Sequence, residues 1–302
     1  MSKLIKKIKN PSSLLVRLRW ELTKRGYYNS WSDEKYLLHK YKIKFKRKLD
    51  LNNPKLFTEK LQWLKINDRK SLYTQMVDKY EAKKYIKDIV GDKYNVPTYG
   101  IYEKFSDINF DEIPDKFVMK CTHNSGGTVI CTNKNEFKKE EANKKISKNL
   151  EYSHYYSGRE WPYKNVKPRI IIEKLLQNDD KSEVVEYNFF CFNGEPKLVM
   201  TCSGDKRIKR YNDFYDMNFK KIELKCEYDN SDVIYQKPKQ FDKMVELSKK
   251  LSAKIPHLRV DLYVCNDKIY VGELTFYHWS GFCKFEPEEW DRKMGEWLDL
   301  KK

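Results

Sequence analysis

The chain has 302 residues, of which 40% are hydrophobic, 15% aromatic and 35% charged. This length allows two or three subdomains around a sizeable core, and the aromatic content excludes a disordered protein. The apolar stretches fall far short of the ~20 residues that span a bilayer. Residues Met1–Asn10 alternate lysines with single apolar residues, which is not the pattern of a hydrophobic signal peptide. We therefore expect neither a transmembrane nor a secreted protein.

The cysteine pattern favours a cytoplasmic protein. Seven cysteines are scattered, without a CxxC pair, at positions 121, 131, 191, 202, 226, 265 and 283. An odd number without paired spacing argues against a zinc ribbon or a disulfide framework. We expect most of these thiols to be small buried side chains in the reducing cytosol.

The positive charge is concentrated at the N-terminus. The net charge is +17, and residues 1–48 hold 15 lysines and arginines against three acids. Leu4, Ile5 and Ile8 share one helical face among lysines, a pattern that suits adsorption to an anionic membrane surface. A solvated basic helix packed on the body is an alternative. Nucleic acid is a weaker one, because no zinc-finger, RNP-type or basic-zipper motif accompanies the charge.

In chain order, the sequence predicts helices first and then antiparallel hairpins. The first 50 residues favour helix, a turn follows at Asn53-Pro54, and Val96–Gly100 is extended. Around residue 125 a predicted strand is followed by a glycine turn and then by a second strand, not by a helix. This order excludes a Rossmann or P-loop unit, so the class is mixed α+β. The other predicted helices are Thr58–Ile66, Leu72–Ile89, Glu136–Leu150 and Tyr235–Leu251, with 151–168 as a loop. The predicted strands are Phe117–Cys121, Val129–Cys131, Arg169–Leu176, Glu186–Phe192, Pro196–Thr201, Leu258–Val264 and Lys268–Leu274.

The last predicted hairpin carries a candidate metal site. Strand alternation places Arg259 and Asp261 on one face, and likewise Glu273 and Thr275. Pairing through the turn at Asn266-Asp267 would bring Asp261 and Glu273 side by side. Two adjacent carboxylates repel unless a cation or proton compensates them, and Mg²⁺ prefers such oxygen ligands. The alternative is a surface hairpin whose charges face water.

Two further segments have the chemistry of a nucleotide site. Lys120 precedes a glycine loop with Gly126 and Gly127, where a lysine and backbone N–H groups can hold a phosphate. The strand end Glu173–Leu176 could present backbone to an adenine edge. An ordinary glycine turn and an ordinary strand end remain open as alternatives.

The candidate features follow one another in the order typical of the ATP-grasp fold: a phosphate-binding lysine, a glycine loop, a hinge at a strand end and a hairpin with paired carboxylates. The chain resembles the TupA-like ATP-grasp family of cell-surface polysaccharide clusters over about residues 50 to 300. The resembling stretches are Asn53–Leu64, Val77–Tyr80, Phe117–Thr128, Glu186–Gly194, Phe214–Asp216, Arg259–Tyr263 and Gly272–Phe276.

The resemblance implies a division of the chain and a role for each matching residue. It leaves 1–50 as a basic arm and makes 51–302 the ATP-grasp domain, with a small subdomain over about 96–175 and a metal and substrate subdomain over 176–302. Lys79 and Lys120 resemble phosphate lysines, and Gly126 and Gly127 a loop over the triphosphate. The residues similar to the adenine hinge are Glu173, Lys174, Leu175 and Leu176, with Glu186 a ribose ligand. Asp261 and Glu273 resemble Mg²⁺ carboxylates, and Arg259 resembles the arginine that steadies the transferring phosphoryl group. Thr275 stands where many members have Asn, and its hydroxyl could still ligate Mg²⁺ or a bound water.

The implied activity is an ATP- and Mg²⁺-dependent ligase that forms an amide, through an acyl phosphate, on a carboxylate of a cell-surface polysaccharide. Its partners would be a carboxylate-bearing glycan or lipid-linked precursor and an amine donor, met at the inner face of the plasma membrane. A sugar phosphotransferase, a glycosyltransferase and a membrane scaffold with a vestigial site are the alternatives. The segment Phe276–Phe282 suits either a sugar-facing surface or ordinary packing, and its His278 is a candidate base. Arg207, Arg210 and Tyr211 suit either an acidic acceptor or a solvated loop.

Overall fold

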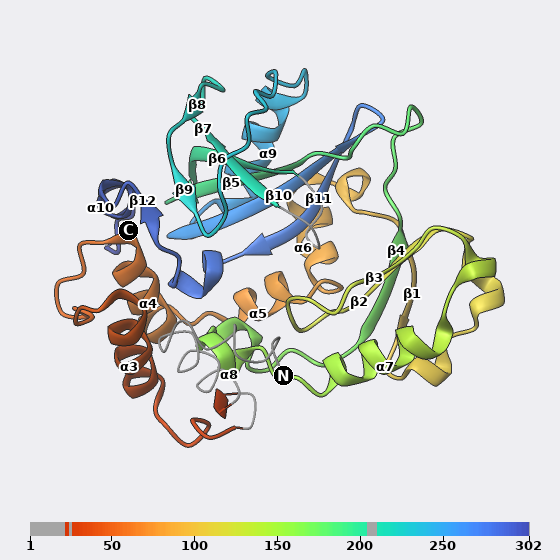
Figure 1. Cartoon of the computed structure of the whole chain (residues 1–302), viewed down its shortest axis with the longest axis horizontal. Helices are drawn as coiled ribbons and strands as arrows, with labels where there is room; N and C mark the ends of the chain where they lie inside the picture. Colours follow the sequence, from red (N-terminus) through yellow and green to blue (C-terminus); the bar gives the residue numbers. More distant parts are fainter. Residues whose placement is uncertain (1–21, 24–25, 204–209, 302) are drawn as a thin grey trace, which may run out of the picture.

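The computed structural model describes residues 22–23, 26–203 and 210–301 (Figure 1). The predicted helical face of Leu4, Ile5 and Ile8 lies outside these residues. Helices dominate the N-terminal part, as predicted. The first four described are α3 (Asp33–Phe45), α4 (Phe57–Asn67), α5 (Ser71–Val77) and α6 (Ala82–Val90).

The prediction of one helix over Leu72–Ile89 is wrong, because α5 ends at Val77 and α6 begins only at Ala82. The Asp78 carboxylate accepts hydrogen bonds from the backbone N–H groups of Tyr80 (2.9 Å) and Glu81 (3.4 Å). The backbone N–H of Lys79 donates to Thr122 O, 3.2 Å away, instead of continuing a helix. This break fixes Lys79 next to the segment that follows the first strand of the predicted glycine hairpin.

Two antiparallel sheets make up most of the rest, which confirms the α+β class. The four-stranded sheet has the order β1 (Thr98–Tyr102), β4 (Ile170–Lys174), β2 (Phe117–Cys121) and β3 (Val129–Cys131). The six-stranded sheet has the order β11 (Lys268–Thr275), β10 (His257–Cys265), β5 (Glu186–Phe192), β6 (Glu195–Ser203), β7 (Tyr211–Tyr215) and β8 (Lys221–Ile222). A two-stranded sheet pairs β9 (Lys225–Cys226) with β12 (Phe285–Glu286). The sequence did not predict β7, β8, β9 or β12.

The remaining helices are α7 (Lys139–Leu150), α8 (Tyr155–Gly158), α9 (Phe241–Ser252) and α10 (Glu289–Trp297). Figure 1 shows α7 running along the four-stranded sheet and α9 covering the six-stranded sheet. Helix α9 begins later than predicted, because Pro238 disfavours helical backbone in the residue before it. Helix α7 likewise begins after a short 3-10 turn, and α8 lies inside the predicted 151–168 loop.

Alternation along β10 separates the core from the polar face of the sheet. Leu258 and Val260 belong to the same buried cluster as Phe241 and Leu247 of α9. Because neighbouring strand residues point to opposite faces, Arg259 and Asp261 face away from α9. The six-stranded sheet therefore has one face for packing and another that presents charged groups.

One pair of cysteines forms a disulfide, which the sequence did not predict. Cys226 of β9 is bonded to Cys283, 57 residues later, just before β12. The other five cysteines are free and buried, as predicted. Among the described residues, no helix is both long enough and apolar enough to cross a bilayer.

Candidate functional site

The predicted carboxylate pair is confirmed by the register of the last hairpin. Asp261 on β10 lies directly opposite Glu273 on β11, and Arg259 lies opposite Thr275. Asp261 is 1% exposed, whereas the Glu273 side chain is 31% exposed. The surface-hairpin alternative does not hold for Asp261.

A third carboxylate joins the pair from the other side of β10. Strand β5 places Asn188 opposite Asp261, with Glu186 two residues earlier on the same face. With its amide nitrogen turned toward the carboxylates, Asn188 donates to Asp261 Oδ1 at 2.7 Å and to Glu186 Oε1 at 3.1 Å. Burial raises the pKa of Asp261 to about 7, and the charges of Glu186 and Glu273 add to this against the lowering effect of Arg259. The cluster thus carries more negative charge than Arg259 balances, which fits a divalent cation.

Arg259 is held from three sides. Its Nε and Nη2 donate to the two Asp261 oxygens at 2.7 and 2.6 Å, and Nη2 also donates to Thr275 Oγ1 at 3.2 Å. Its Nη1 lies 2.6 Å from His278 Nδ1. A bidentate arginine–carboxylate pair fixes the guanidinium plane, so the residue is pre-positioned for charge stabilisation. Thr275 thereby serves as a partner of Arg259 in this structure.

His278 lies behind Arg259 and is 1% exposed. Because Arg259 donates to Nδ1, the neutral ring carries its proton on Nε2, which lies 3.2 Å from Cys226 Sγ. Burial lowers the pKa of His278 well below its usual range, and the positive charge of Arg259 adds to this. Both ring nitrogens are engaged, so the geometry makes His278 a positioning residue for Arg259, and its predicted role as a base stays a prediction.

Lysines reach the same region from the helical part and from the four-stranded sheet. Lys79, at the break between α5 and α6, lies with Nζ 3.6 Å from Glu273 Oε1 and donates to Asn124 O at 2.6 Å. Lys120 on β2 pairs with Glu173 on β4 at 2.6 Å. The structure therefore brings Lys79 to the carboxylate pair and joins two predicted residues, Lys120 and Glu173, to each other.

Lys83 is a candidate site residue that the sequence did not reveal. Its Nζ lies 2.6 Å from Glu173 Oε1 and donates to Val96 O at 2.7 Å. Glu173 thus has a lysine on each carboxylate oxygen, Lys83 on one and Lys120 on the other. Lys83 follows Lys79 by four residues, which in the predicted helix over Leu72–Ile89 would place both on one face, and this spacing was the available sign.

The glycine loop and the strand end lie where the sequence placed them, after β2 and after β4. Gly126 (φ +99°) has open space around its α-carbon, whereas a side chain on Gly127 (φ +70°) would meet Asn149. Backbone of this kind leaves loop N–H groups accessible. At the strand end, Lys174 N donates to Pro97 O at 2.9 Å, and Leu175 and Leu176 then lead toward the β10–β11 turn.

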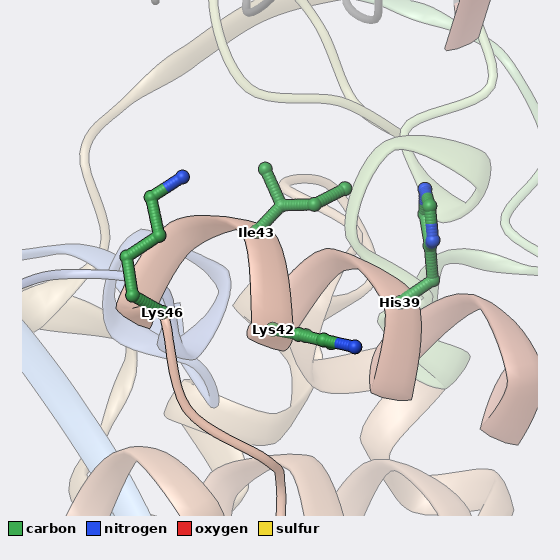
Figure 2. A pocket seen from close by; sticks show the side chains of 4 residues that line it. All are labelled: His39, Lys42, Ile43 and Lys46. Carbon is green, nitrogen blue, oxygen red and sulfur yellow. The ribbon is translucent and has the colours of Figure 1, made fainter.

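A hollow of about 400 Å³ on α3 lies apart from this cluster. Figure 2 shows its four lining side chains, which come from α3 and from its C-cap, Lys46: His39, Lys42, Ile43 and Lys46. It contains no carboxylate and shares no residue with the site above. It is a basic patch of the N-terminal part of the chain.

The site residues together fit a nucleotide triphosphate and Mg²⁺. Mg²⁺ is bound by one or two carboxylates plus phosphate oxygens, and Asp261 and Glu273 could provide such carboxylates. Lys79 and Lys120 could provide positive charge for phosphate oxygens. The predicted roles of Glu186 and of the strand end toward a ribose and an adenine stay predictions.

Comparison with known proteins gives the family of the chain. Residues 59–299 match the family model described as TupA-like ATPgrasp. No curated protein matches the chain. The described fold is similar to D-alanine–D-alanine ligase from Helicobacter pylori (TM-score 0.44, 18% identity, 76% of this chain and 60% of that chain). It is also similar to D-alanine–D-alanine ligase from Bacillus anthracis complexed with ATP (TM-score 0.38, 16% identity, 68% of this chain and 62% of that chain).

A further similar structure is the ATP-grasp ligase PsnB complexed with a phosphomimetic variant of its minimal precursor, Mg and ADP (TM-score 0.40, 11% identity, 74% of this chain and 60% of that chain). The chain spans about three fifths of the length of the solved structures that it matches. At these identities the similarity concerns the fold.

Proposed function

Because the chain belongs to the TupA-like ATP-grasp family, we propose that it is an ATP- and Mg²⁺-dependent ligase that forms an amide on a carboxylate of a cell-surface polysaccharide or its precursor. The observation that carries the proposal is the Asp261–Glu273 pair, with Arg259 fixed beside it and Lys79 opposite. Phosphoryl transfer requires positioning and charge stabilisation rather than a nucleophilic side chain, and this cluster supplies both.

The proposed chemistry assigns each charged residue a task. The acceptor carboxylate attacks the γ-phosphorus of ATP and releases ADP, and the amine donor then attacks the acyl carbon and releases inorganic phosphate. Asp261 and Glu273 would hold Mg²⁺, which neutralises phosphate charge when bound. Arg259, held by Asp261 and His278, stabilises the negative charge on the transferring group, and Lys79 and Lys120 neutralise the remaining phosphate oxygens.

The source of the oxygen in the released phosphate tests the reaction. Full-length protein is incubated with ATP, Mg²⁺, an amino-acid mixture and oligogalacturonate whose carboxylates carry heavy oxygen. A ligase transfers one heavy oxygen to inorganic phosphate and adds an amide to the oligosaccharide, as seen by mass spectrometry. A phosphotransferase would instead leave phosphate on the sugar, and a scaffold with a vestigial site would consume no ATP. Either of these results would contradict the ligase.

We also propose that the basic N-terminal part holds the enzyme at the cytoplasmic face of an anionic membrane, where lipid-linked glycan precursors lie. Its support is the charge of residues 1–48 and the basic patch of Lys42 and Lys46 on α3. Replacing Lys3, Lys6, Lys7 and Lys9 by Gln is expected to weaken vesicle binding steeply, because each basic residue near such a surface contributes about 1 kcal/mol. Flotation with phosphatidylglycerol vesicles measures this, with phosphatidylcholine vesicles as the control. Equal flotation of the variant and the wild type would refute the membrane role.

A further inference from the structure

An aromatic and basic row lies beside the carboxylate cluster and has no part in the chemistry proposed above. The Tyr228 and Trp279 rings are 5.9 Å apart at an interplanar angle of 53°. The Arg210 guanidinium carbon lies 5.7 Å from the centre of the Tyr228 ring. These three residues come from the segment before β7, the segment after β9 and the turn after β11, so the fold assembles the row from distant parts of the sequence.

Trp279 is presented to solvent by an unusual backbone. It is 46% exposed and is the only tryptophan among the large exposed hydrophobic residues that the structure describes. Both Trp279 (φ +49°, ψ +38°) and Ser280 (φ +54°, ψ +25°) have left-handed backbone, which residues other than Gly and Asn rarely adopt. Strain of this kind persists only where the surroundings enforce it, and it is concentrated at functional sites.

Buried groups enforce this turn. Lys65 donates to Ser280 O at 2.7 Å, Gln62 donates to Gly281 O at 2.8 Å, and the Ser280 hydroxyl donates to the Glu160 carboxylate. The Cys226–Cys283 disulfide also ties the strand before Tyr228 to the segment after Trp279. Both aromatic rings are thus mounted on rigid backbone, which is the arrangement that a binding surface requires.

Arg210 connects the row to the reacting groups. Its Nη2 lies 3.8 Å from Glu186 Oε2, and its Nε is buried without a hydrogen-bond partner among the described residues. Glu186 belongs to the carboxylate cluster, and Trp279 follows His278, which contacts Arg259. A molecule stacked on Trp279 and Tyr228 with an acidic group at Arg210 would therefore reach the neighbourhood of Asp261 and Arg259.

We propose that Trp279, Tyr228 and Arg210 bind a sugar ring that carries a carboxylate, and that this surface holds the acceptor glycan. The apolar C–H face of a pyranose stacks on aromatic rings, and the planar guanidinium of an arginine recognises a carboxylate. The combination selects an acidic sugar over a neutral one. The inference rests on the proposed ligase function, because it assigns the acceptor to this surface.

Calorimetric titration of the full-length protein with hexagalacturonate tests the surface, with maltohexaose as the neutral probe. Wild type is expected to bind hexagalacturonate and to bind maltohexaose more weakly. Trp279→Asn keeps the left-handed backbone and should weaken hexagalacturonate binding about tenfold, whereas Trp279→Phe keeps a ring and most of the affinity. Arg210→Gln should remove the preference for the acidic probe. Tyr27→Ala, which removes another exposed aromatic ring before α3, is the matched control and should bind as wild type does.

Binding of ADP with Mg²⁺, measured on the same samples, separates this inference from the proposed function. If wild type binds ADP and Mg²⁺ but not hexagalacturonate, or if Trp279→Asn binds hexagalacturonate as tightly as wild type, the surface is refuted and the ligase proposal is not. If hexagalacturonate binding depends on Trp279 while ADP does not bind, the surface is supported and the ligase proposal fails.

Discussion

Replacing Glu273 by Gln is expected to abolish the stabilisation that ADP and Mg²⁺ together give to the folded protein. Glu273 lies opposite Asp261 and, among the residues that the structure describes, has one ion-pair partner, Lys79 at 3.6 Å, so the amide removes the metal-binding charge with little loss of packing. A ligand at 100 times its Kd stabilises a protein by about 2.7 kcal/mol, which thermal unfolding resolves as a shift of several degrees. With ADP present, the variant should unfold at the same temperature as it does without ADP, at every Mg²⁺ concentration.

The matched control is Glu246→Gln on α9. Glu246 is also a glutamate paired with lysines, Lys243 at 2.6 Å and Lys250 at 2.8 Å, but it lies on the helix that covers the opposite face of the sheet. It should keep the full shift with ADP and Mg²⁺. A Mg²⁺-dependent shift that survives in Glu273→Gln would remove Glu273 from the metal site. If wild type shows no shift with ADP and Mg²⁺, the proposal that the protein binds a nucleotide is contradicted.

The sequence predicted the neighbourhood of the carboxylate pair because alternation and a turn are local features. The alternation of Arg259 and Asp261 places two side chains on one face, and a tight turn at Asn266-Asp267 sets the register as far as Leu262 opposite Val271. A register shift between Asp261 and Leu262 then places Glu273 rather than Gly272 opposite Asp261, and the sequence did not predict this irregularity. The strands β2, β5, β10 and β11 were predicted for the same reason, because each combines an apolar run with a nearby turn.

The lysines opposite the pair depend on contacts that the sequence does not display. Periodicity made 72–89 one helix, but the hydrogen bond from Lys79 N to Thr122 O and the Asp78 carboxylate end α5 early. After this break Lys79 lies 3.6 Å from Glu273, and Lys83, in the first turn of α6, pairs with Glu173. Helix propensity is a weak preference that such contacts override.

The surroundings of His278 were hidden for a similar reason. Cys226 and Cys283 become neighbours through the pairing of β9 with β12, two strands of two residues each that carry no periodic pattern. Their bond places sulfur next to the ring of His278. The contact of His278 Nδ1 with Arg259, 2.6 Å away, was therefore not predicted, and the role of His278 as a base stays a prediction.

Replacing Arg259 by Met should destabilise the protein far more than replacing Asp261 by Asn. Arg259 balances Asp261 at 2.6 Å and also interacts with the charges of Glu186 and Glu273, so its loss leaves buried carboxylates without compensation. Breaking a buried ion pair in this way costs about 3–5 kcal/mol. Asp261→Asn leaves Arg259 with two other carboxylates and should cost clearly less. Urea unfolding of both single variants and the double variant measures the coupling, and the double variant should be more stable than Arg259→Met alone.

The stability that Arg259→Met loses depends on pH, because the pKa of Asp261 is raised in the folded protein. The pKa of Asp261 is raised to about 7 in the folded protein, above its unfolded value, and removing Arg259 raises it further. A group with a raised folded pKa binds more protons when folded, so it contributes stability at low pH that is lost as the pH rises through the folded pKa. Arg259→Met should therefore lose more stability at about pH 8 than at about pH 5, where Asp261 is protonated. Arg69→Met, which removes a partly exposed arginine paired with Asp33 at 2.6 Å, should cost about 1 kcal/mol or less at either pH. Equal losses for Arg259→Met and Arg69→Met would show that Arg259 does not compensate the carboxylate cluster.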